Sequence, residues 1–571
     1  MADSPAMPFL HGAREEHIFP TLTPPQVARL TARGRIQSVA AGDVLLDVGE
    51  PMTRLFVVSS GRLKVERVSP TGNQLIVEYT SGQFTGEITL LAGRPAVARV
   101  YAAEPGTVVE VSRDRLLDLL QADAELSQIL MRAFILRRVE LIASGLGDVV
   151  LVGSNRWSST VRLREFLSHN GHPFSFVDLD RDAGVDEILN RVHVESRIEP
   201  MLICRNTLVL HNPTNEQIAD CLGFNAGVDL NRIRDVVVVG AGPAGLSAAV
   251  YGASEGLDLL VIETRWPGGQ AGLSSRIENY LGFPTGISGQ DLAGRAYSQA
   301  QKFGADVLIA KPALRLHCGQ GPYVIELADG TRVSTRAVIV ANGVEYRRIC
   351  EQLAKVEGAG VYYGATFLEA QLCRDEDVVV VGGGNSAGQA AVFLADTASH
   401  VHMLVRSGNL SDTMSRYLIR RIEEHPRITV RFFTEIISAQ GDEHLEHIEW
   451  RDSRTGLTEG HPIRHVFVMT GAVPNASWLE GCAVLDDKGF IKTGTDLAAD
   501  DLARARWPLD RHPYLLETSL PGVFAMGDIR CGSVKRVASA VGEGSIVISF
   551  VHQVLQALAA AEPQTQPQVT V

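Results

Sequence analysis

The chain has 571 residues, of which 45% are hydrophobic and 21% are charged. This composition is typical of folded globular proteins, and at about 100–200 residues per domain the length predicts roughly three to five domains. The formal net charge of −13 at pH 7 argues against a protein that binds nucleic acid.

The amino terminus and the cysteines narrow the class of protein further. The first residues, MADSPAMPFLHGAREEH, lack a basic start followed by an apolar run, and no segment is expected to supply the ~20 apolar residues that cross a bilayer. We therefore expect a cytoplasmic protein without a membrane span.

The cysteines form no Cys-x-x-Cys pair and no metal-ligand cluster, so neither a structural disulfide nor a bound metal is expected. They are Cys204, Cys221, Cys318, Cys350, Cys373, Cys482 and Cys531.

The first segment, residues 1–146, is predicted to be a small antiparallel roll followed by a helix. Short apolar runs that alternate near period two are separated by turn residues, among them Gly42, Gly49 and Gly61. From residue 113 to 144, apolar residues recur every three or four positions, which predicts one long amphipathic helix. This arrangement resembles the cyclic-nucleotide-binding domain of the catabolite activator family, which places glycine turns at matching positions.

The phosphate cassette of that family corresponds to residues 82–102, GQFTGEITLLAGRPAVARVYA. Gly86 and Glu87 match the Gly-Glu pair with which the cassette begins. The resemblance implies that these two residues and Ile88 would lie at a cyclic phosphate and a ribose hydroxyl.

The second half of the cassette departs from the family. Its phosphate-pairing arginine and the following small hydroxyl residue are replaced by Ala96 and Val97. Arg99 lies three positions further on, and that odd offset on a strand turns its side chain to the opposite face. Two interpretations stay open: ordinary cyclic-nucleotide binding, or a structural or partner-docking role. No DNA-reading helix pair follows the roll, so a transcription factor is not expected.

Residues 147–228 alternate strand and helix in the order β-α-β-α-β-β-α, which resembles the thioredoxin/glutaredoxin fold. In that fold the first strand-to-helix turn holds a Cys-x-x-Cys pair, where a helix N-terminus lowers the pKa of the attacking thiol. Here the turn reads SNRWSST and has no cysteine. Cys204 and Cys221 lie elsewhere and are interpreted as packing residues. The domain is predicted to keep the fold without the thiol chemistry.

A third segment begins with DVVVVGAGPAGLSAAVYGASEGLDLLVIE, a buried strand, a G-x-G-x-x-G turn, a helix and a second strand that ends in an acid. Glycines in this context allow a tight turn and the approach of backbone amides to a pyrophosphate, while the acid binds a ribose hydroxyl. The pattern predicts a dinucleotide site made by Gly240, Gly242, Pro243, Ala244, Gly245 and Glu263.

A second unit of the same kind, DVVVVGGGNSAGQAAVFLADTASHVHMLVRSG, ends its second strand in Arg406 instead of an acid. Glu263 would repel a 2′-phosphate and therefore suits FAD, whereas Arg406 would attract one and suits NADPH. Arg416 is a further candidate for the 2′-phosphate. The turn residues of this second site are Gly382, Gly384, Asn385, Ser386 and Ala387.

Five motifs surround the two units: WPGGQAG, IENYLGFP, VIVANG, TGAVPN and PGVFAMGDIR. In this order and spacing they resemble low-molecular-weight thioredoxin reductase over about 234–558. The resemblance implies an FAD domain at 229–348 and 472–560, an NADPH domain at 349–471 inserted into it, and a homodimer. It also places at FAD the residues Gly269, Gln270, Asn279, Gly343, Gly527, Asp528, Arg536, Val537 and Ala538.

The chain is thus predicted to combine a β-roll with a helix, a thioredoxin-like α/β domain and two Rossmann-like α/β domains. In the family, a Cys-x-x-Cys pair ahead of the second glycine turn carries electrons from FAD to a protein disulfide. Here the matching positions are Gly364 and Phe367, and Cys373 is the nearest thiol, interpreted as a packing residue.

Without that pair the hydride path from NADPH to FAD is expected to be intact and the path to a disulfide cut. The expected acceptor is a small redox carrier protein or a small molecule such as a quinone or oxygen. Two alternatives stay open: a disulfide reductase that uses other cysteines, including ones supplied by another chain, and a flavin or NADPH redox sensor with little turnover.

Overall fold

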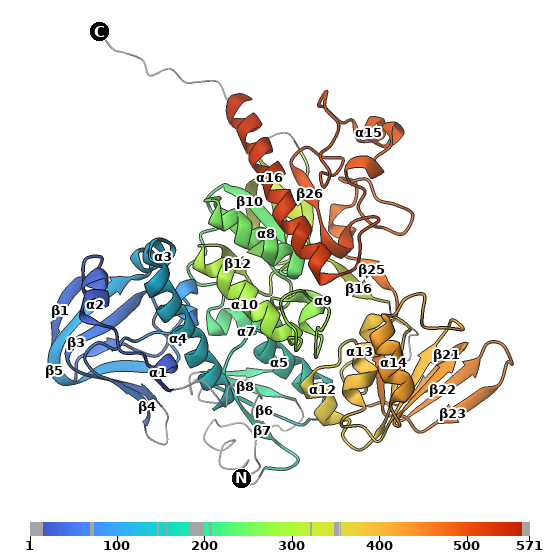
Figure 1. Cartoon of the computed structure of the whole chain (residues 1–571), viewed down its shortest axis with the longest axis horizontal. Helices are drawn as coiled ribbons and strands as arrows, with labels where there is room; N and C mark the ends of the chain where they lie inside the picture. The colour runs from blue at the N-terminus through green and yellow to red at the C-terminus, as the bar shows by residue number, and fades with distance from the viewer. Residues whose placement is uncertain are drawn as a thin grey trace. The chain divides into compact units, whose positions relative to one another are not determined.

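The computed structural model describes residues 15–68, 73–144, 148–155, 157–182, 199–204, 208–319, 322–347, 353, 356–441 and 444–561. The helices and strands are labelled in Figure 1. The chain divides into two compact units, and each is described here by itself. The first comprises Met1–Val228 with Gln301–Ile309, and the second comprises Asp229–Ala300 with Ala310–Val571.

The first unit begins with the predicted antiparallel roll, whose strand order is β1-β5-β3-β4 with β2 paired to β5. Inward-facing side chains of the two long strands, such as Phe56, Val58, Val109 and Val111, are 0–1% exposed and form its core. The elements are α1 (Glu15–Ile18), α2 (Pro24–Thr31), β1 (Arg35–Val39), β2 (Val44–Leu46), β3 (Arg54–Arg67), β4 (Gln74–Tyr79), η1 (Ile88–Ala92) and β5 (Arg99–Ser112).

The single long helix predicted after the roll is two helices, α3 (Arg113–Ala122) and α4 (Ala124–Ala143). Asp123 between them has extended backbone angles, φ −121° and ψ 98°. Its carboxylate accepts a hydrogen bond from the Leu126 amide at 3.0 Å and pairs with Arg29 at 2.8 Å. An acidic N-cap stabilises the start of a new helix at this point. The apolar periodicity continues through the break, so the sequence pattern does not reveal it.

The second sheet of this unit has the order β7-β6-β8-β9, in which β7 is parallel to β6 while β8 and β9 run antiparallel. The predicted helix between the second and third strands falls within 183–198, outside the described residues. The described elements are β6 (Val149–Gly153), α5 (Ser158–His169), β7 (Ser175–Asp178), β8 (Met201–Cys204), β9 (Leu208–His211) and α7 (Asn215–Leu222). The separate piece of the unit carries β12 (Asp306–Leu308).

The second unit contains the sheet of the predicted FAD domain. Parallel strands β11, β10, β15 and β26 lie side by side, and antiparallel β14 and β13 extend the sheet beyond β15. The elements are β10 (Arg234–Val239), α8 (Pro243–Ser254), β11 (Leu259–Ile262), α9 (Gly269–Gly272), α10 (Gly289–Lys302), β13 (Ala313–His317), β14 (Tyr323–Leu327), β15 (Arg332–Val340), β26 (Val523–Ala525), η4 (Gly527–Ile529) and α16 (Val537–Ala561).

The predicted NADPH domain has a parallel sheet of order β17-β24-β18-β19-β20 and an antiparallel sheet β21-β22-β23. Its elements are β17 (Val361–Tyr362), α12 (Phe367–Leu372), β18 (Asp377–Val381), α13 (Asn385–Leu394), β19 (His400–Val405), α14 (Arg416–Glu424), β20 (Ile428–Phe432), β21 (Thr434–Gln440), β22 (His447–Asp452), β23 (Thr458–His461) and β24 (His465–Val468). Strands β16 (Val344–Tyr346) and β25 (Ala472–Pro474) pair antiparallel where the chain enters and leaves this domain.

A disulfide joins Cys318, directly after β13, to Cys482, shortly after η2 (Ser477–Leu479). The expectation of no structural disulfide was therefore wrong. The two cysteines are 164 residues apart, and β13 and η2 come together only when the sheet forms. Spacing along the chain cannot show such a pair.

Helix α16 also corrects an expectation, because Val537–Ala560 is long and apolar enough to cross a membrane by composition. Length and composition are weak grounds for a span, since a helix packed in a protein core has the same features. Here α16 packs on α8: Gly544 brings its backbone against Ser247, whose hydroxyl donates to the Val541 carbonyl at 2.7 Å. The sequence analysis did not identify this stretch as a possible membrane span because glycines and polar residues lie between its apolar residues.

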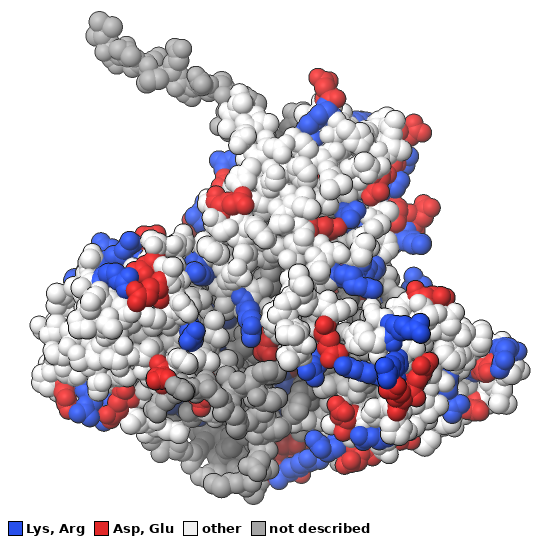
Figure 2. Space-filling model, in the orientation of Figure 1, with Lys and Arg blue, Asp and Glu red and all other residues white. Residues whose placement is uncertain are grey.

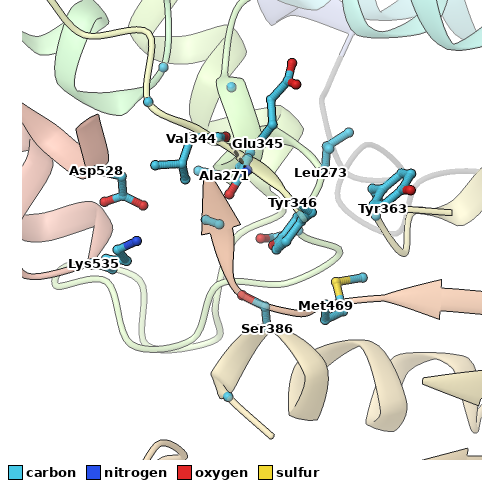
Figure 3. A pocket seen from close by; sticks show the side chains of 18 of the residues that line it. Ala271, Leu273, Val344, Glu345, Tyr346, Tyr363, Ser386, Met469, Asp528 and Lys535 are labelled. Atoms are coloured by element: carbon cyan, nitrogen blue, oxygen red, sulfur yellow. Dashed lines mark hydrogen bonds between the residues drawn. The ribbon is translucent and has the colours of Figure 1, made fainter. Parts of the chain in front are cut away.

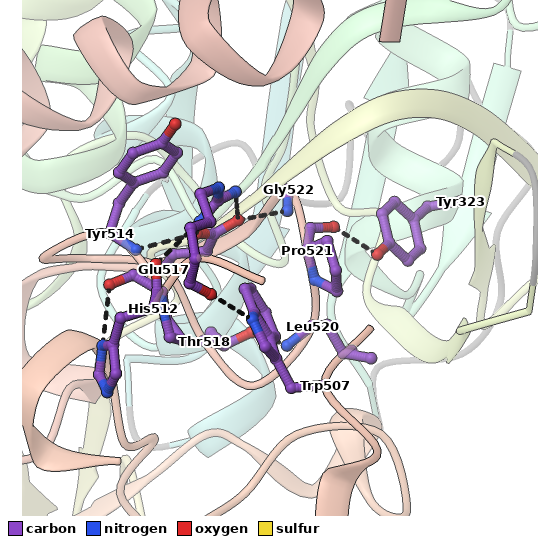
Figure 4. Close-up of polar contacts among 11 residues, drawn as sticks. Tyr323, Trp507, His512, Tyr514, Glu517, Thr518, Leu520, Pro521 and Gly522 are labelled. Carbon is purple, nitrogen blue, oxygen red and sulfur yellow. Dashed lines mark hydrogen bonds and ion pairs between the residues drawn. The ribbon is translucent and has the colours of Figure 1, made fainter. Parts of the chain in front are cut away.

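A buried carboxylate organises the loop before β26, after η3 (Gly494–Asp496) and α15 (Ala499–Ala505). Glu517 is 0% exposed, and its carboxylate accepts hydrogen bonds from both terminal guanidinium nitrogens of Arg511, at 2.5 and 3.0 Å. It also accepts the backbone amides of Tyr514 and Gly522, each at 2.9 Å (Figure 4). Because the buried charge has four donors, it holds the segment that leads through β26 to Asp528.

Candidate functional site

The residues predicted to bind the two dinucleotides meet at one cavity of about 1110 Å³ in the second unit (Figure 3). Pockets for single drug-sized ligands usually measure about 300–1,000 Å³, so this cavity has room for more than one such group. Of the predicted residues, those that line it are Gly240, Gly242, Pro243, Ala244, Glu263, Gly269, Gln270, Asn279, Gly343, Gly364, Gly382, Gly384, Asn385, Ser386, Arg406, Gly527, Asp528, Arg536 and Val537.

Three predicted residues, Gly245, Ala387 and Ala538, are not among the lining residues, and the first two serve packing. A Cβ at Gly245 would lie 1.8 Å from the Gly240 carbonyl oxygen, so this glycine allows α8 to pack closely on its strand. Ala387 is 0% exposed within α13. Ala538 belongs to the first turn of α16.

The first glycine turn leaves its backbone open toward the cavity. Gly240 has φ +106°, and a Cβ there would lie 2.5 Å from the Ala341 carbonyl oxygen. At Gly242 the nearest atom to an added Cβ is 3.9 Å away, so the backbone faces free space. Glu263, directly after β11, accepts the amides of Ala241 at 2.7 Å and Arg265 at 2.8 Å. Its burial raises the pKa of this carboxyl.

The second glycine turn repeats this geometry at the carboxyl end of β18. Gly382 has φ +146°, and an added Cβ would lie 2.5 Å from the Met469 carbonyl oxygen. A Cβ at Gly384 would meet nothing within 4 Å. The Asn385 side chain accepts the Ser415 amide at 2.7 Å, which fixes the start of α14. A dinucleotide phosphate therefore fits both turns, because each presents uncovered backbone at a helix N-terminus.

The residue directly after β19 carries the positive charge that is predicted to pair with the 2′-phosphate of NADPH. Arg406 is exposed and lines the cavity together with Ser407 and Thr413, which the sequence reading missed. Thr413 donates to the Gly383 carbonyl at 2.8 Å. Arg416, the first residue of α14, is not among the lining residues.

The residues implied for the flavin line the same cavity. Gln270 donates from Nε2 to the Val344 carbonyl at 2.5 Å. Burial raises the pKa of Asp528, and the nearby Lys535 ammonium acts in the opposite direction. The Asn342 side chain donates to the Asn475 backbone carbonyl at 2.6 Å, and the Asn475 side chain donates to the Asn342 carbonyl at 2.9 Å. These two hydrogen bonds join the segments through which the chain enters and leaves the predicted NADPH domain.

The segment in place of the expected dithiol packs against the predicted flavin site. Ala365 forms a parallel β-bridge with Ser274, and a Cβ at Gly364 would lie 3.0 Å from the Cβ of Leu273. Phe367 begins α12. Cys373 is 0% exposed, is not among the lining residues, and has its pKa raised by burial to about 12. Its thiol is therefore neither accessible nor ionised near neutral pH, as its interpretation as a packing residue requires.

The tyrosines Tyr346 and Tyr363 also line the cavity, and the sequence reading did not single them out. Their rings stack with centroids 6.5 Å apart and planes 13° from parallel. Tyr346 ends β16 and Tyr363 directly precedes Gly364. The only signal in the sequence was their position next to two motifs.

In the roll, the predicted effector residues are engaged within the protein. The Glu87 carboxylate accepts from the amide and hydroxyl of Thr89 and lies 3.6 Å from Arg138. Ile88 starts η1, and the Gly86 carbonyl accepts from Arg137 at 2.9 Å. Arg99 binds both carboxylate oxygens of Asp47, at 2.9 and 3.0 Å.

The turn after β6, where a thioredoxin fold would carry its thiols, is held by polar side chains. Ser154 donates to Asp180 at 2.6 Å, and Asn155 donates to Asp178 at 2.6 Å. Cys204 is buried in β8, and Cys221 is partly buried in α7. Among the residues that the structure describes, no cluster of histidine, cysteine and acidic side chains could hold a metal ion.

Comparison with known proteins identifies two parts of the chain. A family model described as pyridine nucleotide-disulphide oxidoreductase matches residues 234–544, and one described as cyclic nucleotide-binding domain matches 36–123. A thioredoxin reductase of Treponema pallidum (strain Nichols) is 33% identical over 55% of this chain and 94% of its own length. One of Streptomyces clavuligerus is 30% identical over 59% and 99%. The crystal structure of T. acidophilum thioredoxin reductase is 26% identical, covers 57% of this chain and 100% of that one, and has a TM-score of 0.50.

The chain therefore belongs to the pyridine nucleotide-disulphide oxidoreductase family. Within it, the chain is a thioredoxin reductase-like, NAD(P)H-dependent flavin oxidoreductase with an N-terminal cyclic nucleotide-binding β-roll. FAD and NADPH, the cofactors predicted from the sequence, are those that its relatives use.

Proposed function

We propose that the chain is an NADPH-dependent FAD oxidoreductase whose flavin delivers electrons without a dithiol in the NADPH domain. The observation that carries this proposal is the residue at the cavity wall where the family presents sulfur. That residue is Gly364, and a Cβ there would lie 3.0 Å from the Leu273 Cβ, so a side chain would require Leu273 to shift slightly. Cys373 cannot substitute for the pair because it is buried with a raised pKa.

The chain's own residues account for the binding and orientation of both cofactors. FAD supplies reversible hydride chemistry when bound. The amides around Gly242 would receive its pyrophosphate, Glu263 a ribose hydroxyl and Asp528 the ribitol. The amides around Gly384 would receive the NADPH pyrophosphate, and Arg406 would pair with the 2′-phosphate. The open backbone at the two glycines supports these assignments.

Anaerobic mixing of the purified protein with NADPH tests the proposal, followed by a panel of ferricyanide, quinones, oxygen and thioredoxin. We expect rapid loss of the oxidised flavin's visible absorption and then turnover with acceptors that need no thiol. Rapid thioredoxin turnover would favour the disulfide-reductase alternative. Tight cofactor binding with negligible turnover on every acceptor would favour the sensor.

Cofactor preference is expected to depend on Arg406. Replacing Arg406 with aspartate should weaken NADPH use roughly tenfold or more and reverse the preference toward NADH, because a charged partner of the 2′-phosphate becomes a repulsive one. Steady-state rates with both nucleotides measure the change. Arg416→Asp is the matched control, and its preference should remain that of the parent. Equal use of both nucleotides by the parent would contradict the assignment of Arg406.

Cyclic AMP is expected to bind weakly or not at all. Ala96, at the position of the family's phosphate-pairing arginine, is 1% exposed and carries no charge, and Arg99 is paired with Asp47. Isothermal titration calorimetry of the full chain measures the affinity. Submicromolar binding that disappears in Arg99→Gln would show that Arg99 reaches the pocket and that the proposed register is incorrect.

We further propose the domain limits 1–146, 147–228, 229–348 with 472–560, and 349–471. The strand order β7-β6-β8-β9 and its directions support a thioredoxin-like fold for the second domain, and the turn at Ser154 supports the loss of its thiols.

We propose a cytoplasmic homodimer that pairs through the FAD domain. The family resemblance supports this pairing, and light scattering measures the mass.

A further inference from the structure

The cavity contains an aromatic pair to which the sequence motifs of the two dinucleotide sites assign no role. The rings of Tyr346 and Tyr363 are 13° from parallel with centroids 6.5 Å apart, and both side chains line the cavity (Figure 3). Stacked aromatic rings in proteins typically lie with centroids about 4.5–7 Å apart. The pair is therefore at the wide end of that range. A modest increase in the distance between the two rings would let another flat ring lie against the face of either tyrosine.

The Tyr363 ring is held at its hydroxyl end. The Tyr363 hydroxyl donates to Glu357 at 2.8 Å. The Tyr346 side chain lies next to Ser386 of the second glycine turn, and burial raises the pKa of its hydroxyl. Because the polar end of Tyr363 is anchored, its ring face is fixed in orientation before any ligand arrives, which lowers the entropic cost of stacking a ligand on it.

The surroundings favour a flat, uncharged ligand. Leu273, Ala365 and Met469 line the same cavity and present apolar or polarisable groups, and methionine sulfur contacts aromatic rings favourably. Charged side chains of both signs line the cavity. Glu345 pairs with Arg265 at 3.4 Å, and Glu357 accepts the Tyr363 hydroxyl, so these two acids are engaged within the protein. Apolar walls with few polar groups are typical of sites for small aromatic molecules.

The position of the pair relates it to electron transfer. Tyr363 directly precedes Gly364 in the chain, and both residues line the cavity that contains the predicted flavin residues. An acceptor bound at this wall would share that cavity with the flavin.

We propose that Tyr346 and Tyr363 bind a planar aromatic electron acceptor of the quinone class. This inference rests on the proposed function and names its substrate class. The net reaction is NADPH plus one solvent proton plus quinone giving NADP⁺ and hydroquinone. Two electrons and two protons convert both quinone carbonyls to hydroxyls, and the nicotinamide is oxidised.

Binding of menadione to the oxidised holoenzyme without NADPH tests the site apart from turnover. Isothermal titration calorimetry compares the parent with Tyr363→Leu, which removes the ring, and Tyr363→Phe, which keeps it. We expect the leucine variant to bind menadione roughly three- to tenfold more weakly and the phenylalanine variant to bind like the parent. Tyr251→Leu, on the exposed part of α8, is the control and should have no effect.

Kinetics separate this inference from the proposed function. In Tyr363→Leu the KM for menadione should rise while turnover with ferricyanide, which is not planar, stays at the parental value. Flavin reduction by NADPH in the parent reports on the proposed function alone. Unchanged menadione affinity in Tyr363→Leu would overturn the inference. A rise in the KM for NADPH in place of menadione would also overturn it and assign the rings to the nicotinamide.

Discussion

Replacing Arg511 with methionine is expected to destabilise the second unit by about 3 kcal/mol, because it leaves the Glu517 carboxylate buried without its cation. Glu517 is 0% exposed, whereas the Arg511 side chain is 32% exposed, so the cost falls mainly on the acid. The two backbone amides that Glu517 also accepts limit the loss. The midpoint of thermal unfolding, followed by release of FAD fluorescence, should fall by several degrees.

A matched control and a partial rescue make this expectation specific. The Arg504 side chain is 74% exposed and lies 3.6 Å from the buried Asp501, which Lys492 also pairs at 3.0 Å. Arg504→Met should therefore change stability by less than about 0.5 kcal/mol. Adding Glu517→Gln to Arg511→Met removes the unpaired charge but keeps an acceptor for the amides, so part of the stability should return. Equal losses in the Arg504 and Arg511 variants would show that the buried pair is not the cause.

The dinucleotide turns could be predicted because their physical causes are local. Gly240, Gly242 and the acid Glu263 lie within one strand-turn-helix-strand unit, and the φ of +106° that favours glycine belongs to that turn, although the crowding of an added Cβ comes from the distant Ala341 carbonyl. The same holds for Gly382 and its unit. The cavity that these distant units share could not be predicted from the turns, since nothing in either turn specifies where the other lies.

Other features depend on contacts between distant segments and could not be predicted. The Cys318–Cys482 disulfide forms across 164 residues, and the break at Asp123 depends on a side-chain cap within an unbroken apolar pattern. The stacking of Tyr346 on Tyr363 needs strands from two different sheets to be in place. Sequence spacing carries no information on any of these three.

The unaltered protein is expected to reduce its FAD with NADPH and yet fail to turn over thioredoxin or an aromatic disulfide. Transfer to a disulfide requires a thiolate that attacks sulfur. Gly364 and Phe367 carry no nucleophile, and burial raises the pKa of Cys373 to about 12. Cys373→Ser should therefore leave all rates unchanged apart from any loss of stability.

Installing the pair should restore thiol chemistry only if room is made for it. A Cβ at Gly364 would lie 3.0 Å from the Leu273 Cβ, closer than ordinary contact. We therefore expect Gly364→Cys with Phe367→Cys to show little activity, and the same pair with Leu273→Ala to form a disulfide that NADPH reduces. Thiol titration before and after NADPH measures the gain, and Leu273→Ala alone is the control. Thioredoxin turnover by the unaltered protein that Cys373→Ser abolishes would make Cys373 the catalytic thiol and contradict the absence of a working dithiol.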